Sequence, residues 1–157
     1  NIHKVLEEIL MLEKDTITRK NGRFEQIYDP SLPPIEADED QLKQVFLNLI
    51  KNAIEASRKG GKVEIITRVG SGYAVKTALS PVPQQHIVVE IIDSGIGMDE
   101  ETQKKLFTPF HTTKQKGSGL GLPISLKIVE DHHGKIKVTS EKDLGTTVQV
   151  FLPTRKR

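Results

Sequence analysis

The sequence predicts a single α+β domain, and three observations lead to that prediction. The chain has 157 residues, a length that fits one domain with its own core. About five short segments rich in β-branched residues are bounded by turn signals, as expected of strands. One long segment, residues 38–57, instead repeats its apolar residues with the spacing of an amphipathic helix.

The helical segments are predicted from apolar periodicity and capping residues. Residues 2–18 carry one apolar stripe, and residues 38–57 carry another behind the N-cap candidates Asp38 and Asp40. A short helix is expected at residues 99–106, and a last one from Leu122 to His133.

The strands are expected at five places, and the connections between them carry Gly, Pro, Asn or Ser. These strands are residues 23–28, 62–69, 87–92, 135–140 and 146–152. Residues 70–85 have no clear pattern and predict a loop or an irregular hairpin, and Pro153 is expected to end the last strand.

The composition excludes several classes of protein. The net charge of +2 is too small to indicate nucleic-acid binding, and the absence of cysteine excludes disulfides and thiolate metal sites. No apolar run approaches the ~20 residues that would span a bilayer, so we expect no membrane contact by this fragment. The absence of cysteine fits a cytoplasmic location, and both a soluble and a membrane-anchored full protein are compatible with it.

The stretch from Phe107 to Ser125 is the first candidate site. Gly117, Gly119 and Gly121 lead into the last helix, with Lys114 and Lys116 just upstream. Glycines allow close backbone approach, and the N-terminus of a helix attracts phosphate. The spacing does not fit the GxxxxGK[ST] phosphate loop or the GxGxxG dinucleotide fingerprint. From the glycines alone, phosphate binding and a flexible surface loop are equally supported.

Two further features suggest a ligand, each beside a simpler alternative. Asn48 and Asn52 lie one turn apart, at the border of the apolar face of helix 38–57. Their amide oxygens suit a hard cation, although this helix alone favours the simpler interpretation, a solvated helix face. Asp93 follows Val89 and Ile91 on the inward side of a strand, where a carboxylate needs a donor such as a ligand amino group. A polar turn at the strand end is the alternative.

Four separated pieces, taken together, resemble the catalytic domain of sensor histidine kinases. They are NLIKNAIEA (48–56), DSGIGM (93–98), LFTPFHTTK (106–114) and GSGLGL (117–122), which resemble the asparagine, first glycine, phenylalanine and second glycine boxes. GTTVQVFLP is similar to the closing strand, and the match covers about residues 36–153. The DPSLP and LPISLKIVEDHHGKI segments most resemble the nitrogen-regulation sensor kinases.

The resemblance implies the Bergerat ATP-binding fold: a two-layer α/β sandwich whose mixed sheet has helices on one face. It implies that Asn52, assisted by Asn48, holds Mg²⁺, that Asp93 accepts from the adenine amino group beside Gly97, and that Phe107–Gly119 forms a lid. The implied ATP-binding residues are Asn48, Lys51, Asn52, Asp93, Gly95, Gly97, Met98, Phe107, Phe110, Lys114, Lys116, Gly117, Ser118, Gly119, Leu120, Gly121 and Thr146.

The chain also departs from the family pattern. Glu55 and Ala56 stand where many relatives have a basic and an aromatic residue, so Lys51, Lys114 and Lys116 are the alternatives for a phosphate contact. The phosphoacceptor histidine box is absent. The five histidines, His3, His86, His111, His132 and His133, are interpreted as surface or structural residues.

The resulting hypothesis is an ATP-binding catalytic domain, residues 21–157, that supplies Mg-ATP to a histidine elsewhere. Residues 1–20 would be a helical link from an upstream dimerisation domain carrying that histidine, and a response regulator would be the downstream partner. Two alternatives are an ATPase of the same superfamily and a non-catalytic nucleotide-sensing or partner-binding module. The short lid argues against the first, and the complete Asn48, Asn52 and Asp93 set argues against the second.

Overall fold

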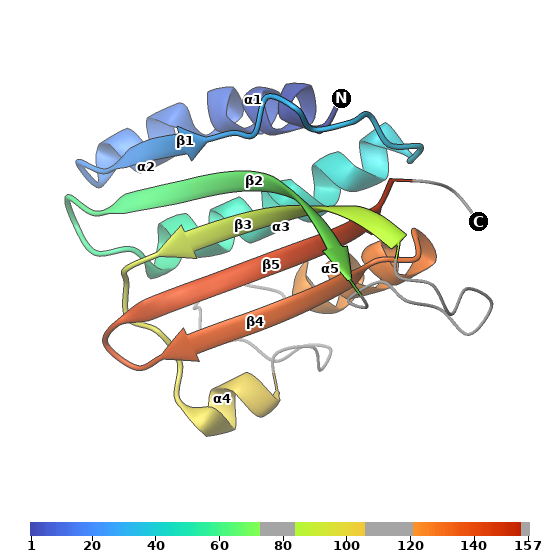
Figure 1. Ribbon diagram of the computed structural model, residues 1–157. Coiled ribbons are helices and arrows are strands. Elements are labelled where there is room, and N and C mark those ends of the chain that lie inside the picture. Colours follow the sequence, from blue (N-terminus) through green and yellow to red (C-terminus); the bar gives the residue numbers. More distant parts are fainter. Residues whose placement is uncertain (73–83, 106–120, 155–157) are drawn as a thin grey trace.

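The structure is a computed structural model that describes residues 1–72, 84–105 and 121–154. Its centre is a five-stranded sheet in the order β1-β2-β3-β5-β4 (Figure 1). The strands are β1 (Arg23–Ile27), β2 (Lys62–Gly72), β3 (Gln84–Asp93), β4 (Lys135–Glu141) and β5 (Gly145–Pro153). β1 runs parallel to β2 while every other neighbouring pair is antiparallel, which confirms the predicted mixed sheet.

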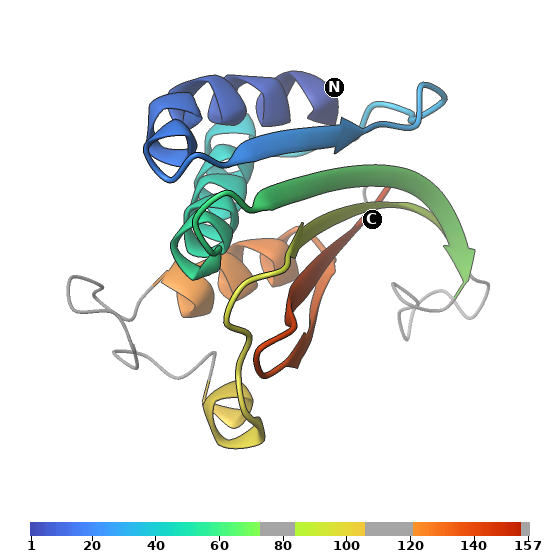
Figure 2. The ribbon, with the colours of Figure 1, turned by 90° about the vertical axis from the view of Figure 1, so that its left-hand side faces the viewer.

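The main helices cover one face of this sheet, as predicted. Figure 2 shows α3 and α5 on one side of the strands, with α1 beside α3, while α4 lies beyond the end of the sheet. The helices are α1 (Ile2–Leu12), α2 (Lys14–Arg19), α3 (Glu39–Ala56), α4 (Glu100–Lys104) and α5 (Gly121–Asp131). In the described part of the chain, no helix is long and apolar enough to cross a membrane.

Helix α3 is the centre of the core. Its N-cap is Asp38, whose carboxylate accepts the Gln41 N–H at 3.0 Å, as the sequence predicted. The apolar stripe is buried against β3, α1 and α5; its members are Leu42, Val45, Phe46, Leu49, Ile50, Ala53 and Ile54. Because this stripe is buried, the neighbouring Asn48 and Asn52 are half-buried at its border.

The predicted first helix is two helices, a correction to the sequence analysis. The helix is interrupted at Glu13, which has φ −98° and ψ 5° and whose side chain is almost fully buried. The Lys51 ammonium of α3 lies 4.0 Å from the Glu13 carboxylate. The apolar pattern continues across the break, so periodicity alone did not reveal it.

Residue Lys20 connects the end of α2 to the end of α3. Its ammonium donates to the carbonyls of Ile54 at 2.9 Å and of Glu55 and Ser57 at 3.0 Å. These are terminal carbonyls of α3, where a positive charge is favourable. Residues 1–20 therefore lie against the same core as α3, whereas their predicted role as a link to another domain stays a prediction.

The β2–β3 hairpin is longer than predicted, a second correction. Residues 70–72 and 84–85, predicted to lie in a loop or an irregular hairpin, are regularly paired strand residues. Gly70 lies opposite His86, and a Cβ on it would come within 2.8 Å of the His86 Nε2. The glycine that looked like a turn signal instead makes room for a buried ring. The last strand, β5, ends at Pro153 as predicted, and Pro153 itself still pairs with His86.

We expect the α1 contact to contribute strongly to stability. Leu6 is fully buried against α3, so Leu6→Ala should lower the free energy of unfolding by about 2–5 kcal/mol. Met11, on the same helix, is 79% exposed, so Met11→Ala should change the free energy of unfolding by less than about 0.5 kcal/mol. Urea denaturation of both variants measures this, and equal effects would contradict the packing described.

Candidate functional site

A row of three polar side chains crosses the end of the sheet on the face that carries the helices. Asp93 of β3 pairs with Thr146 of β5, and Thr146 pairs with Ser140 of β4. Directly paired residues point to the same face, so the three side chains are neighbours. Asp93 is only 6% exposed, which confirms that its carboxylate points inward.

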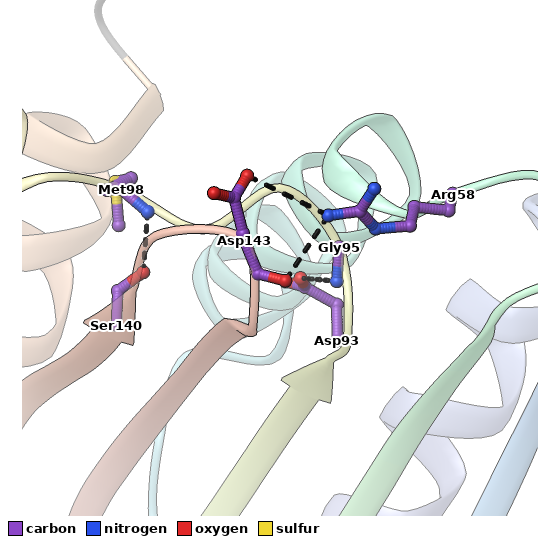
Figure 3. Close-up of polar contacts among 6 residues, drawn as sticks. All are labelled: Arg58, Asp93, Gly95, Met98, Ser140 and Asp143. Atoms are coloured by element: carbon purple, nitrogen blue, oxygen red, sulfur yellow. Dashed lines mark hydrogen bonds and ion pairs between the residues drawn. The ribbon is translucent and has the colours of Figure 1, made fainter.

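The Asp93 carboxylate is held by backbone donors. It accepts the Gly95 N–H at 3.0 Å (Figure 3) and the Thr146 N–H. Burial raises the pKa of this carboxyl above its ordinary value, and the two N–H donors only partly oppose the increase. The folded domain therefore maintains an acceptor whose charge is incompletely compensated by the protein.

The turn after Asp93 fits between α3 and the β4–β5 hairpin. A Cβ on Gly95 would come within 1.9 Å of the Ala56 carbonyl, and one on Gly97, which has φ +64°, within 2.0 Å of the Glu141 carbonyl. Both glycines are thus required by contacts within the protein. The resemblance to sensor histidine kinases implied that both glycines contact ATP, and the structure gives a different reason for the same residues.

A hydrogen-bond network fixes the end of this turn. Ser140 Oγ accepts the Met98 N–H at 2.9 Å, as drawn in Figure 3, and lies 2.8 Å from Thr146 Oγ1. Gln103 of α4 donates to the carbonyls of Met98 and Ser140, both at 3.0 Å. The Met98 backbone is therefore held on both sides.

Ser140 and Gln103 are site residues that the sequence analysis missed. Ser140 follows Ile136 and Val138 on the inward face of β4, which is the same signal that identified Asp93 at the end of β3. Applying the alternation rule to every strand would have found Ser140. Gln103 gave no comparable signal, because its role depends on where α4 lies relative to β4.

A second group of candidate residues lies between α3 and α5. The Asn48 amide nitrogen is 3.4 Å from both the Gly121 carbonyl and Ser125 Oγ. Gly121 begins α5, so Asn48 of the predicted asparagine box faces the last glycine of the second glycine box at the start of a helix. Asn52, one turn further along α3, is half-buried.

The remaining candidates fall into two sets. Lys51 lies with Glu13 at the α1–α2 break, whereas Asn48 contacts α5. The other candidates lie outside the described residues; they are Phe107, Phe110, Lys114, Lys116, Gly117, Ser118, Gly119 and Leu120.

The described histidines have structural contacts, as interpreted from the sequence, or lie on the surface. His3 stacks on Tyr28, with ring centroids 4.4 Å apart, and His86 is buried beside Phe151. His132 accepts the Asp38 N–H at 3.1 Å and lies 2.8 Å from the Ile128 carbonyl. His133 is exposed in the turn after α5. His111 is outside the described residues.

Comparison with known proteins identifies the family. Residues 37–156 match the sequence profile described as histidine kinase-, DNA gyrase B-, and HSP90-like ATPase. The chain belongs to this ATPase family. The resemblance to sensor histidine kinases, inferred from four motifs, agrees with that result.

Curated relatives of this ATPase domain are bacterial sensor kinases. It is 42% identical over 156 residues to the sensory histidine kinase/phosphatase NtrB of Azospirillum brasilense, covering 98% of the chain and 38% of that protein. It is 47% identical over 121 residues to sporulation kinase C of Bacillus subtilis, covering 77% of the chain and 25% of that protein. The chain thus spans less than half the length of these relatives.

Solved structures confirm the fold of the ATPase domain. The catalytic domain of histidine kinase ThkA superposes with a TM-score of 0.80 at 33% identity, covering 99% of this chain and 93% of that one. ThkA has also been solved in complex with the response regulator protein TrrA. That structure superposes with a TM-score of 0.75 at 32% identity, covering 98% of this chain and 40% of that one. The predicted α+β sandwich is confirmed.

We expect Asp93→Asn to stabilise the ligand-free domain at neutral pH. Because the pKa of Asp93 is raised in the folded state, its ionised form disfavours folding. This penalty is complete above the folded-state pKa and disappears as the pH falls below the ordinary value of 3.8. Urea unfolding at neutral pH and at acidic pH should show a stabilisation that shrinks on acidification.

Asp99→Asn is the control, because it should change the free energy of unfolding in the opposite direction. The exposed Asp99 caps α4, and the Thr102 hydrogen bond lowers its pKa, so its charge favours folding at neutral pH. Two results would contradict the interpretation that the ionised Asp93 carboxylate disfavours folding. One is a stabilisation by Asp93→Asn that persists unchanged at acidic pH, and the other is a lower stability of this variant at neutral pH.

Proposed function

We propose that this chain is the ATP-binding catalytic domain of a two-component sensor histidine kinase, which positions Mg-ATP for phosphoryl transfer to a histidine on another domain. The observation that carries the proposal is the inward Asp93 carboxylate, which is buried beside the backbone N–H donors of Gly95 and Thr146 in a domain that matches the family. A buried acceptor of this kind calls for a donor from a ligand.

At the adenine end, Asp93 would accept from the exocyclic amino group. Thr146, which pairs with Asp93 in the sheet, lies close enough to join the same hydrogen-bond network. Gly97 would lie against the base, with Gly95 and Met98 fixing the turn. The pKa of Asp93 should fall when the amino group binds, because a donor favours the ionised carboxylate.

At the phosphate end, the start of α5 supplies a suitable electrostatic environment. Backbone N–H groups and the positive end of a helix dipole favour phosphate oxygens, and Gly121 lies there beside Asn48. This placement supports the proposed role of the glycine stretch. Lys114 and Lys116 would add positive charge, whereas Lys51, which lies 4.0 Å from the Glu13 carboxylate, is the less suitable candidate.

The residues present fit a Mg²⁺ ion bound mainly by the nucleotide. Among residues 1–72, 84–105 and 121–154, no cluster of three or more acidic or histidine side chains could hold a metal by itself. Mg²⁺ typically takes one or two protein oxygens beside phosphates and water. Asn48 directs its nitrogen to α5, which leaves its oxygen as a candidate ligand together with that of Asn52. When bound, the ion would neutralise phosphate charge.

The role of this domain is then positioning and electrostatics, while the acceptor histidine comes from elsewhere. Residues 1–20 would connect to the dimerisation domain that carries it. The complex of ThkA with TrrA supports a response regulator as the next partner. A cytoplasmic location fits these partners. Autophosphorylation would require the dimerisation domain to be supplied.

The adenine assignment is tested with Asp93→Ala and two nucleotides. The wild-type domain should prefer ATP to GTP, because guanine presents a carbonyl where adenine presents its amino group. Asp93→Ala should lose about 1–3 kcal/mol of ATP binding, which is about 5- to 150-fold in affinity. Calorimetric titrations measure both. Equal wild-type affinity for ATP and GTP would refute the adenine pocket.

The metal assignment is tested with Asn52→Ala. Loss of one oxygen ligand should weaken ATP binding in the presence of Mg²⁺ by about 10- to 100-fold, with little effect when the metal is chelated. Gln44→Ala is the matched control, because Gln44 is exposed on the same helix. Native thermal unfolding must be retained. An unchanged affinity in excess Mg²⁺ would remove Asn52 from the site.

A further inference from the structure

The Ser140 hydroxyl has three hydrogen-bond partners but only one proton, so it must accept from the other two partners. Its Oγ lies 2.9 Å from the Met98 nitrogen, 3.0 Å from the Gly145 carbonyl oxygen and 2.8 Å from Thr146 Oγ1. A serine hydroxyl donates one proton and accepts through two lone pairs. The identity of the three partners therefore determines where each proton lies.

Only one assignment satisfies all three contacts. The Met98 N–H can only donate, so it occupies one lone pair of Ser140, and the Gly145 carbonyl can only accept, so it takes the Ser140 proton. The second lone pair then accepts the Thr146 proton. If Ser140 instead donated to Thr146, its oxygen and the Gly145 oxygen would lie 3.0 Å apart with no proton between them.

We propose that Ser140 is a specificity-determining positioning residue, which makes Thr146 an acceptor-only group. With its proton committed to Ser140, the Thr146 oxygen offers only lone pairs to its surroundings. Its sheet partner Asp93 is also an acceptor, with its pair of backbone donors already in place. Two adjacent acceptors select a ligand edge that donates, directly or through one water, and disfavour a carbonyl. This inference rests on the proposed ATP site and deepens it.

Gln103 has a different role in the same network. Its Nε2 carries two protons, and these match the two carbonyls of Met98 and Ser140. Gln103 therefore fixes the position of the turn but not the direction of the Thr146 proton. Loss of Gln103 should weaken all purine nucleotides alike, whereas loss of Ser140 should change the preference between them.

The experiment compares ATP with inosine triphosphate, in which a carbonyl replaces the amino group. Mg-nucleotide affinities are titrated for the wild type, Ser140→Ala, Ser140→Thr and Gln103→Ala. The wild type should prefer ATP. Ser140→Ala frees the Thr146 hydroxyl to donate, so the ATP preference should fall about tenfold. Ser140→Thr retains a hydroxyl and should restore the preference, and Gln103→Ala should leave the ratio unchanged.

Thr146→Val tests the same acceptor without altering Ser140, so it remains informative if Ser140→Ala folds poorly, and the two changes together form a double-mutant cycle. Thr146→Val removes the acceptor while preserving shape, and it should lower the ATP preference as Ser140→Ala does. Ser140→Ala added to Thr146→Val should then produce no further change in the ratio. A ratio that stays at the wild-type value in both single variants overturns the role of Ser140 while leaving ATP binding established. Failure of the wild type to bind ATP overturns the proposed function itself, and this inference with it.

Discussion

The backbone of Ile96 joins the parts of the molecule on which the candidate site depends. Its N–H donates to the Ala56 carbonyl at the end of α3 at 3.1 Å, and its carbonyl accepts the Asp143 N–H of the β4–β5 turn at 2.7 Å. Arg58 adds a bond to the Asp143 carbonyl at 3.2 Å, as Figure 3 shows. A helix end and a hairpin thus determine where the chain after Asp93 runs.

This constraint explains why a buried carboxylate is tolerated at the end of β3. Fixing the turn presents the Gly95 N–H to Asp93, and sheet pairing brings Thr146 beside it. These contacts only partly offset the cost of burial, so the pKa of Asp93 remains raised. The raised pKa lowers the stability of the domain without ligand, and under the proposed function the same carboxylate would favour a ligand that donates there.

Sequence patterns predicted the features that depend on local periodicity. The buried stripe of α3, its Asp38 cap and the inward direction of Asp93 all follow from helical or strand alternation. Features that depend on contacts between distant segments were missed or misassigned. Gly70 looked like a loop residue because the His86 ring opposite it was not visible in the sequence. The break at Glu13 likewise involves Lys51, which lies far along the chain.

The position of residues 1–20 has a consequence for choosing a minimal fragment. The family match begins at residue 37, but Leu6 fills the core and Lys20 binds three terminal carbonyls of α3. A fragment cut at the homology boundary would expose the apolar surface of α3 and leave those carbonyls to solvent. The segment that the family profile matches, residues 37–156, is therefore shorter than the segment that packs around one core, and expression boundaries should follow the core.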